Sequence, residues 1–409
     1  VELDESFSVQ LFGLDVGAIQ DFDNSLVTVG GPTASFIVLD NDSAEISIAD
    51  VTITEDDNGK TLVLMTVTLD TAVDVPVTVD YTTNDDTATS ADNNTSGDQD
   101  YLDSSGTLTF VGQAGEQQKI GIYVNGDNVV EATEALSVAL SNVGASGRNV
   151  IIGDASGTLT ITNNDSAVLS IESASSVVEG GTGQLVVTLS NPVDVDVTYD
   201  HATADGTATT AGNDYTNTSA AAVVFSNAVG ASLTQTLSVA TTADDVVELD
   251  ENFTITISDL QPSDGSRQLS LGNDTGTITI TNDDAATIAI NDVVVNENTG
   301  TATLTVTLTQ PVDVDVTLNA NTADGTATAS AQGTLPSDYS STLVEPAGGT
   351  VTFTAGGALT QNVEVTINDD SIVELNEMLN VVLSSLSATG RDVTLADANG
   401  VFDNTGTIT

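Results

Sequence analysis

The stretch VVELDENFTI at residues 246–255 combines a cluster of carboxylates with a run that begins to alternate apolar and polar side chains. Related stretches occur three more times in the 409 residues, as VELDESFSV (1–9), VVEATEALSV (129–138) and IVELNEMLNV (372–381). Their leading glutamates, Glu2, Glu131, Glu248 and Glu374, are 129, 117 and 126 residues apart. A motif that returns at so regular an interval indicates an array of tandem structural repeats.

Other landmarks return in the same order around each copy of this stretch. Each unit opens with a segment that contains a glutamate: ITED (53–56), VVEGG (177–181) and VNENTG (295–300). An Asp-containing segment follows, TNDDTAT (83–89) or TADGTAT (203–209 and 322–328), and then an Asp-Tyr pair in DQDY (98–101), GNDY (212–215) and PSDY (336–339). An acidic triplet closes the unit, in SGTLTITNND (156–165) and TGTITITNDD (275–284). The order predicts the C-terminal half of a repeat at 1–43, repeats at 44–166 and 167–285, and a repeat at 286–409 that lacks its closing triplet. We therefore expect the chain to begin and end within an array.

Between the landmarks the sequence alternates with a period of two. The segments GQLVVTLSNPVDVDVTYD (183–200) and TATLTVTLTQPVDVDVTLN (301–319) alternate apolar and polar residues on both sides of a turn that contains proline. This period is typical of strands with one buried face, and short strands joined by Gly, Asn and Asp turns favour a two-sheet sandwich. We predict an all-β fold of tandem immunoglobulin-like antiparallel β-sandwiches, with VVELDENF on a loop that leads into a strand.

The charge of the chain limits its partners. It carries 60 acidic and 5 basic residues, which gives a formal net charge of −55. However, 39% of its residues are apolar, whereas disordered acidic tails have a low apolar content. So few Lys and Arg residues cannot neutralise the phosphates of nucleic acid or bind an anionic membrane surface. No apolar run approaches the roughly 20 residues that cross a bilayer. Hard divalent cations remain as partners, with general solubility or adaptation to salt as the alternative explanation of the acid.

The composition also argues against catalysis. The chain has no cysteine and a single histidine, His201, so Ser-His-Asp, Cys-His and cysteine-zinc sites cannot be assembled. His201 is replaced by Tyr81 and Ala320 in the other repeats, so the fold requires no imidazole there. Carboxylate pairs can hydrolyse glycosidic bonds, but such clefts are usually aromatic, and this chain has 4% aromatic residues and no tryptophan. We predict that the protein is not an enzyme.

The acidic residues gather at the repeated stretch. Asp244, Asp245, Glu248 and Glu251 lie within eight residues, and the closing triplet follows about thirty residues later. Four carboxylates this close repel one another unless solvent or a cation screens them. Ca²⁺ accepts six to eight oxygen ligands in flexible geometry, whereas Mg²⁺ seldom uses all-protein cages. The pattern favours Ca²⁺, with a solvated acidic loop as the alternative.

The opening glutamate, the DGTA segment with its following Asp-Tyr, the D-D-x-x-x-E-x-x-E stretch and the closing N-D-D together resemble the Calx-β repeat over nearly the whole chain. That family includes calcium-sensing domains of sodium–calcium exchangers and parts of many bacterial surface proteins. The resemblance implies an immunoglobulin-like sandwich with Ca²⁺ clustered at one tip, beside the linker to the next domain. Cadherin-like repeats are the second choice, because DND (40–42) would suit a calcium linker.

The resemblance also implies a ligand set for each repeat. The expected ligands are Glu55, Asp100, Asp127, Glu131, Glu134 and Asp165; then Glu179, Asp214, Asp244, the Val246 carbonyl, Glu248, Glu251, Asp283 and Asp284; then Glu297, Asp338, Asp369, Asp370, Glu374 and Glu377. The first repeat departs from the pattern at Gly126, Asn163 and Asn164, and the second at Ala243. We therefore expect the third site to be the fullest and the first to be the weakest. The half-repeat keeps Glu2, Glu5, Asp40 and Asp42.

Two other residue types recur in register. Arg148, Arg267 and Arg391 follow the same turn of each repeat, where each forms either an internal salt bridge or a bond to a neighbouring domain or chain. Tyr101, Tyr215 and Tyr339 follow the Asp ligand, and we expect them to be core residues with a tethered hydroxyl.

These observations predict a non-catalytic structural region in which Ca²⁺ at the tips between repeats stiffens a rod. We expect it in an extracellular filament or a bacterial surface adhesin, secreted or at the cell surface. Its partners would be neighbouring repeats, identical chains in a filament, or a cell-surface or matrix receptor. The alternatives are an adhesive module for a glycan or protein receptor, with the longer segment 329–349 as its candidate insertion, and a calcium-sensing unit of a larger protein.

Overall fold

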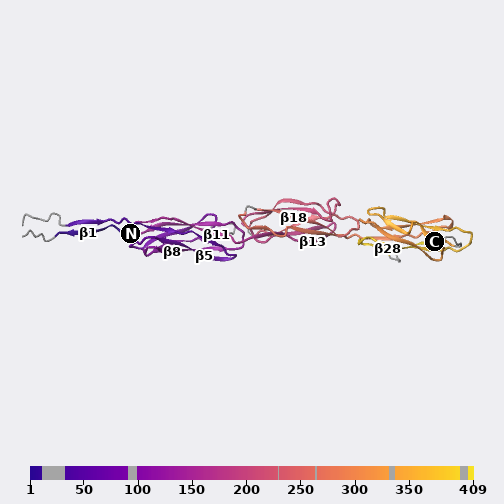
Figure 1. Ribbon diagram of the computed structural model, residues 1–409, viewed down its shortest axis with the longest axis horizontal. Helices are drawn as coiled ribbons and strands as arrows, with labels where there is room; N and C mark the ends of the chain where they lie inside the picture. Colours follow the sequence, from indigo (N-terminus) through magenta and orange to yellow (C-terminus); the bar gives the residue numbers. More distant parts are fainter. Residues whose placement is uncertain (12–32, 91–98, 229, 263–264, 331–336, 397–403) are drawn as a thin grey trace, which may run out of the picture.

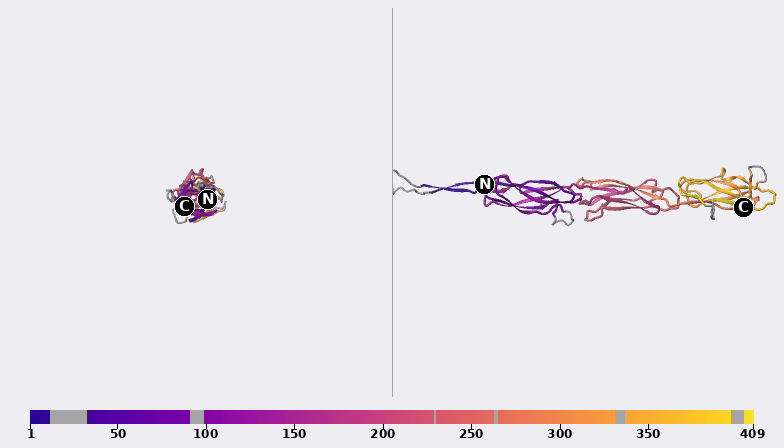
Figure 2. Two further views of the ribbon diagram at one scale, coloured as in Figure 1. Left: turned by 90° about the vertical axis from the view of Figure 1, so that its left-hand side faces the viewer. Right: turned by 90° about the horizontal axis from the view of Figure 1, so that it is seen from below.

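Three β-sandwiches lie end to end, and a two-stranded hairpin projects from the first of them (Figure 1). The computed structural model describes residues 1–11, 33–90, 99–228, 230–262, 265–330, 337–396 and 404–409. Seen along its long axis the molecule has a narrow cross-section, so the array is a rod (Figure 2). The described residues form strands and one 3₁₀ turn, Glu297–Thr299, and none of their helices has the length and apolarity to cross a membrane.

The first sandwich packs a four-stranded sheet, ordered β10-β3-β5-β8, on a five-stranded sheet, ordered β4-β11-β9-β6-β7. Most pairs are antiparallel, as predicted, but β3 pairs in parallel with β10 and β4 with β11, because the first strand of the repeat divides between the two sheets. The strand bounds are β3 Ala44–Ile48, β4 Val51–Thr54, β5 Gly59–Leu69, β6 Val77–Asp85, β7 Ser105–Phe110, β8 Glu116–Gly126, β9 Glu134–Gly144, β10 Val150–Ile152 and β11 Ser156–Thr162.

The second sandwich repeats this topology, with sheets ordered β17-β14-β12-β19 and β13-β20-β18-β15-β16. Its strand bounds are β12 Ala167–Ile171, β13 Ala174–Val178, β14 Thr182–Leu189, β15 Val197–Asp205, β16 Ser219–Phe225, β17 Thr234–Ala240, β18 Glu251–Gln261, β19 Leu269–Leu271 and β20 Thr275–Thr281.

The third sandwich differs from the other two in both sheets: one gains two strands at its edge, and the other has four strands in place of five among the described residues. The segment 329–349 supplies two added strands, β24 and β25, so this sheet has six strands in the order β24-β25-β27-β22-β21-β29; residues 331–336 of the segment lie outside the described residues. The second sheet is β26-β23-β28-β30. The bounds are β21 Ala286–Ile290, β22 Thr301–Leu308, β23 Val316–Asp324, β24 Ala329–Ser330, β25 Tyr339–Glu345, β26 Thr350–Phe353, β27 Thr360–Ile367, β28 Leu379–Ser387, β29 Val393–Leu395 and β30 Thr405–Ile408.

Period-two alternation places one face of each strand in the core. Along β14 exposed and buried residues alternate without exception, and Leu185, Val187 and Leu189 point inward. The inward residues of each sandwich form a separate core cluster, as expected for a tandem array. The predicted all-β tandem sandwich fold is therefore confirmed.

In its described residues, 1–11 and 33–43, the half-repeat forms a strand pair, in which β1 (Glu5–Gln10) pairs with β2 (Thr33–Val38). All the residues of both strands are exposed, and Phe7 stacks on Phe36 with ring centroids 5.2 Å apart. Phe7 and Phe36 stand where Leu136 and Leu159 of the first sandwich are buried, so the hairpin has the strand pattern of a repeat without an opposing sheet.

The alternation can be tested by comparing neighbouring residues of β14. Leu185→Ala removes a fully buried side chain, and we expect it to destabilise the second sandwich by about 2–5 kcal/mol. Val186→Ala, on the exposed face, should change stability by less than about 0.5 kcal/mol. Differential scanning calorimetry measures the stability change of each variant, and equal changes for the two substitutions would contradict the alternation.

Candidate metal centres

The segment before each Asp-Tyr pair is fixed by one repeated hydrogen-bond pattern. The hydroxyls of Tyr101, Tyr215 and Tyr339 donate to Asp85, Asp205 and Asp324, each at 2.6 Å. The tyrosine rings are buried, so the prediction of core tyrosines with a tethered hydroxyl is confirmed. The hydroxyl lowers the pKa of the carboxyls of Asp205 and Asp324.

This anchoring places the aspartate that precedes each tyrosine. Asp100, Asp214 and Asp338 each accept a backbone N–H from a threonine of the preceding turn (Thr89, Thr209, Thr328), at 2.5, 2.6 and 2.6 Å. One carboxylate oxygen is therefore held by the turn in every repeat, and the side chain has a defined direction at the tip.

The acidic stretch is a loop that runs into a strand, as predicted: β9 begins at Glu134, β18 at Glu251 and β28 at Leu379. In each loop an aspartate accepts the backbone N–H of the residue two positions later, at 2.7 Å; these aspartates are Asp127, Asp244 and Asp370. Such a local bond favours a turn over a continued strand and keeps the carboxylate at the tip.

The closing triplet joins this loop through its asparagine. Asn163 accepts the N–H of Glu131 at 3.3 Å and donates to the carbonyl of Asp165 at 2.9 Å. Asn282 makes the same two bonds, to Glu248 and Asp284. The interpretation of Asn163 as a departure was therefore wrong: it has the same bridging role as Asn282, and only Asn164 replaces an acid.

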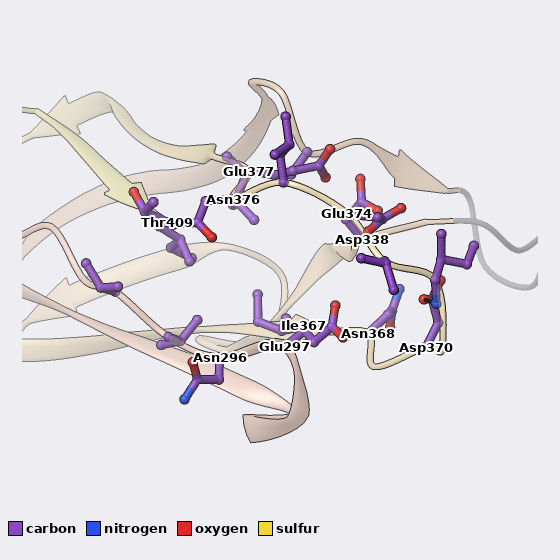
Figure 3. A pocket seen from close by; sticks show the side chains of 18 residues that line it. Asn296, Glu297, Asp338, Ile367, Asn368, Asp370, Glu374, Asn376, Glu377 and Thr409 are labelled. Atoms are coloured by element: carbon purple, nitrogen blue, oxygen red, sulfur yellow. Dashed lines mark hydrogen bonds between the residues drawn. The ribbon is translucent and has the colours of Figure 1, made fainter.

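The loops bring together one group of three carboxylates at each tip, whose ligand atoms lie within 4.8 Å of one another. All nine residues were predicted ligands: Asp100, Glu131 and Glu134; Glu179, Asp283 and Asp284; Asp338, Glu374 and Glu377. Figure 3 shows Asp338 and Glu374 close together at the third tip, with Glu377 further along the same loop as Glu374 and Glu297 nearby on another segment.

In the first tip Glu55 and Asp165 are buried among acids. Burial and the charges of Asp127, Asp165 and Asp100 raise the pKa of Glu55 to about 7. Burial, Asp57 and Asp127 raise the pKa of Asp165. These mutual effects indicate that Glu55, Asp127 and Asp165 lie close to one another, beside the group formed by Asp100, Glu131 and Glu134.

At the second tip, Glu179 and Glu251 each lie beside other carboxylates that raise their pKa. Burial and the neighbouring Asp284 raise the pKa of Glu179 to about 7. Burial, Asp214 and Glu248 raise the pKa of Glu251 to about 7 as well. Burial, Asp244 and Asp214 raise the pKa of Glu248, so every predicted acid of this repeat lies in a group or against one.

The third tip surrounds an open cavity of about 450 Å³ lined by Glu297, Asp338, Asp370, Glu374 and Glu377. Desolvation, Asp370, Asp338 and Glu297 raise the pKa of Glu374. Desolvation, Asp338 and Glu374 raise the pKa of Glu377. The five carboxylates face one another across the cavity.

Several buried carboxylate oxygens lack a protein donor. Within the described residues, Glu55 Oε1, Asp165 Oδ2, Glu179 Oε1 and Asp284 Oδ2 are buried without a hydrogen-bond partner. An uncompensated buried carboxylate is costly unless a counterion or proton is present. Hard cations prefer oxygen donors, so the set of carboxylates fits Ca²⁺, and all four residues are predicted ligands.

Two predicted positions neither join these groups nor raise the pKa of a neighbouring acid. Asp369 is exposed and lies outside the three-carboxylate group of its tip, and Val246 contributes a backbone N–H to Asp244. Gly126, where an acid was expected, cannot carry a side chain without movement, because a Cβ there would lie 1.9 Å from the carbonyl oxygen of Asp56. The relative strength of the three sites stays a prediction.

Sequence reasoning missed two acids near the tips. Asp57 lies close enough to Asp165 to raise its pKa, and it accepts a hydrogen bond from Asn164 at 3.0 Å. Asp313 of the third repeat raises the pKa of Glu248 and Glu251 in the second. The ITED motif continues directly into Asp57, which was a usable signal; for Asp313 the signal is absent, because it belongs to the next repeat.

The tips lie at the junctions between repeats. The N–H of Val130 donates to the carbonyl of Pro192 in the second repeat at 2.9 Å, and the N–H of Val247 donates to Pro311 in the third at 2.9 Å. Val130 and Val247 are fully buried and belong to the core clusters of the repeats that follow them. Each acidic loop is thereby tied to the next sandwich.

The receiving edge is fixed by the repeated arginine. Arg148, Arg267 and Arg391 bind both oxygens of Asp74, Asp194 and Asp313, at distances between 2.5 and 2.8 Å. Each aspartate belongs to the same repeat as its arginine, so of the two alternatives the internal salt bridge is confirmed. A bidentate pair of this kind fixes geometry as well as charge.

A family model described as the Calx-beta domain matches residues 39–166, 162–284 and 281–403. Solved structures with similarity to the chain include the crystal structure of CBD12 from CALX1.2, at 18% identity and a TM-score of 0.26, which covers 58% of this chain and 99% of that one. The crystal structure of the calcium binding domain CBD12 of CALX1.1 has 18% identity and a TM-score of 0.27, and the match covers 57% of this chain and 98% of that one. The crystal structure of the apo-form Calx CBD1 domain has 21% identity and a TM-score of 0.25, and the match covers 30% of this chain and 98% of that one. Among curated proteins none matches.

The raised pKa values predict how stability depends on pH without a cation. Glu55, Glu179 and Glu251 have pKa values of about 7 in the folded chain, so the folded state binds their protons more tightly than the unfolded state does. Their contribution favours folding at low pH and is lost as pH rises from about 4.5 to about 7. In chelator we expect the Tm to fall across this window.

In millimolar Ca²⁺ the decline should be much smaller, because a bound cation favours the ionised carboxylates. Glu179→Gln should remove part of the decline in the second repeat. Thermal melts in chelator between pH 4.5 and 7 measure both effects, and a Tm that rises with pH there would contradict the assignment.

Proposed function

The chain belongs to the Calx-beta domain family, with three such domains in tandem, and from this premise we propose that it is a calcium-stiffened spacer. In this proposal the protein has no catalytic role. Ca²⁺ binds the acidic tips and holds successive sandwiches at fixed angles, so that the array acts as a rod that carries other parts of a larger assembly away from a surface.

The observation that carries the proposal is the set of buried carboxylate oxygens without a donor at the tips, from Glu55, Asp165, Glu179 and Asp284. Acids in this setting need either a proton or a cation, and Ca²⁺ supplies the charge without requiring low pH. Because the unfolded chain lacks the assembled site, binding of the ion also stabilises the folded state.

The junction explains how such an ion would act on the shape of the whole array. In a tandem array each repeat contacts only its neighbours. Two neighbouring repeats are expected to move relative to each other unless the interface between them is large. The acidic loop that holds the ligands is the same loop that inserts Val130 or Val247 into the next core. Restraining the loop therefore restrains the angle between two sandwiches.

The surroundings follow from the affinity expected of such sites. Extracellular calcium modules bind with dissociation constants on the order of 10⁻⁴–10⁻³ M, which suits calcium levels outside the cell. We place the protein in an extracellular filament or a surface adhesin, with neighbouring repeats as its first partners and identical chains or a surface receptor as further ones. The net charge of −55 keeps such rods apart until cations screen them.

The role of the ion can be tested by thermal melts in Ca²⁺, Mg²⁺ and chelator at one ionic strength. We expect Ca²⁺ to raise the Tm of the second repeat, and Glu248→Gln with Glu251→Gln to reduce that shift, because two ligands lose their charge. Glu345→Gln with Glu364→Gln is the matched control, since it changes the net charge equally on two paired strands of the third repeat and neither residue belongs to a three-carboxylate group. Equal melting in all three buffers would refute the calcium role.

Stiffening can be measured as the width of a distance distribution between two repeats. The chain has no cysteine, so spin labels can be placed at Leu62→Cys and Val186→Cys, exposed positions in the first and second repeats. Electron paramagnetic resonance should give a narrow distribution in Ca²⁺ and a broad one in chelator. Labels at Val186→Cys and Val224→Cys, within one repeat, should give the same width in both buffers.

A further inference from the structure

The second sandwich contains an apolar cavity of about 440 Å³ beside its junction with the first. The buried side chains of Leu189 and Phe225 and the partly buried Leu233 line it. Val129 of the first repeat also lines it, so the cavity lies on the boundary between two repeats. Small-molecule sites are concave, largely apolar and often placed between domains, and this cavity has all three properties.

The corresponding place in the third sandwich is closed. Phe225 pairs with Val197 in the second sandwich, and Phe353 pairs with Val316 at the same position of the third. The residues around Phe353 leave no space that admits a water molecule. The core side chains at this place are of the same type in both repeats, so the fold of the repeat does not require a cavity here.

A longer loop distinguishes the second sandwich. Residues 226–233 join its two strands, whereas residues 111–115 and 354–359 do so in the first and third. In the third sandwich the N–H of Gly356 donates to the carbonyl of Val312 at 3.1 Å, so the shorter loop lies directly on the edge that receives the preceding repeat.

The longer loop is attached to the same edge by a side chain. The N–H of Asn227 donates to the carboxylate of Asp196 at 2.9 Å, and its side-chain amide donates to the carbonyl of Asp194 at 2.8 Å. The N–H of Ala231 then donates to the carbonyl of Ala228 at 2.9 Å, which forms a turn, and both alanines line the cavity. These hydrogen bonds give the loop a fixed attachment beside the cavity.

The lining offers no free charge. Of the described residues around the cavity, Asp194 is the one with an ionisable side chain, and both of its oxygens bind Arg267, at 2.8 and 2.5 Å. A bidentate pair of this kind neutralises the aspartate. An ionised ligand would lose its hydration here without gaining a partner, so the site favours an uncharged ligand although the chain has a net charge of −55.

The volume limits the size of the ligand. An apolar cavity of about 150 Å³ holds one molecule of benzene. The cavity of about 440 Å³ therefore has room for two or three linked rings. Phe225 supplies a ring against which an aromatic ligand can pack in an offset or edge-to-face arrangement.

We propose that this cavity binds a small, uncharged aromatic molecule, and that the longer loop of the second repeat creates the site. The ligand packs against Phe225 and Leu233 and contacts Val129 of the preceding repeat. This binding is additional to the proposed spacer function and involves none of the acidic groups at the tips.

The experiment uses the intact chain and two fluorescent probes. N-phenylnaphthylamine is uncharged, and anilinonaphthalene sulfonate has the same ring systems with an added negative charge; the fluorescence of both rises in apolar surroundings. We expect the uncharged probe to saturate one site with a dissociation constant on the order of 10⁻⁴ M, typical of a ligand of this size. The sulfonate should bind at least about tenfold more weakly.

Two substitutions locate the site. Ala231→Trp places a large ring at the lining, and it should weaken binding of N-phenylnaphthylamine at least about tenfold, because the cavity is then partly filled. Val224→Trp adds the same ring at an exposed position of β16 that does not line the cavity, and it should leave binding unchanged. Circular dichroism and the Tm report whether each variant is folded.

A loop exchange tests the same inference without filling the cavity. Replacing residues 226–233 by TAGGAL, the sequence of residues 354–359, should close the cavity and abolish binding. The reverse exchange, which places the longer loop in the third repeat, should raise the number of bound probes from one to two per chain.

Three results would overturn the proposal: no saturable signal from N-phenylnaphthylamine, equal binding of the two probes, or binding that survives the loop exchange. Probe binding should be equally strong in Ca²⁺ and in chelator, because the lining has no carboxylate free to hold an ion. A missing calcium effect on the Tm and a missing probe signal are therefore separate results, and each counts against one proposal only.

Discussion

The main physical constraint on this structure is the repulsion among the carboxylates that are crowded at the end of each sandwich. Burial and mutual repulsion raise the pKa of several of these groups, and four of their oxygens have no donor within the described residues. A solvated acidic surface would spread such charges apart. Here turns, an asparagine bridge and tethered tyrosines hold them together, which is expected where a cation supplies the missing charge.

The same loops connect the chemistry of the tip to the shape of the array. Glu131 and Glu248 follow directly after Val130 and Val247, which lie in the cores of the next repeats. An arginine of the receiving repeat fixes the edge that meets this valine. A change in the acidic loop therefore acts beyond its own repeat, because the loop contributes a contact between two sandwiches.

The candidate sites were largely predictable because their residues recur in order. All nine members of the three-carboxylate groups belong to the ligand sets that the resemblance implied, at the opening glutamate, the Asp-Tyr pair, the acidic stretch and the closing triplet. Asp369 and Gly126 show the limit, since register alone does not reveal that one position is exposed or that the other has a carbonyl 1.9 Å from a potential Cβ. Asn163 was misread although Asn282 stands at the same position of the next closing triplet; the structure adds that both amides accept a backbone N–H of the acidic loop.

By itself the sequence determined the period-two strands, the repeat order, the acidic loops and the residue types at the tips, because these depend on patterns within short segments. Only the tertiary structure decided which repeat each contact serves. Arg148 meets Asp74 across 74 residues, and Val130 enters a core built from the following repeat. Such pairings depend on where the two sheets turn and on how one sandwich is placed on the next, and no local pattern specifies that placement.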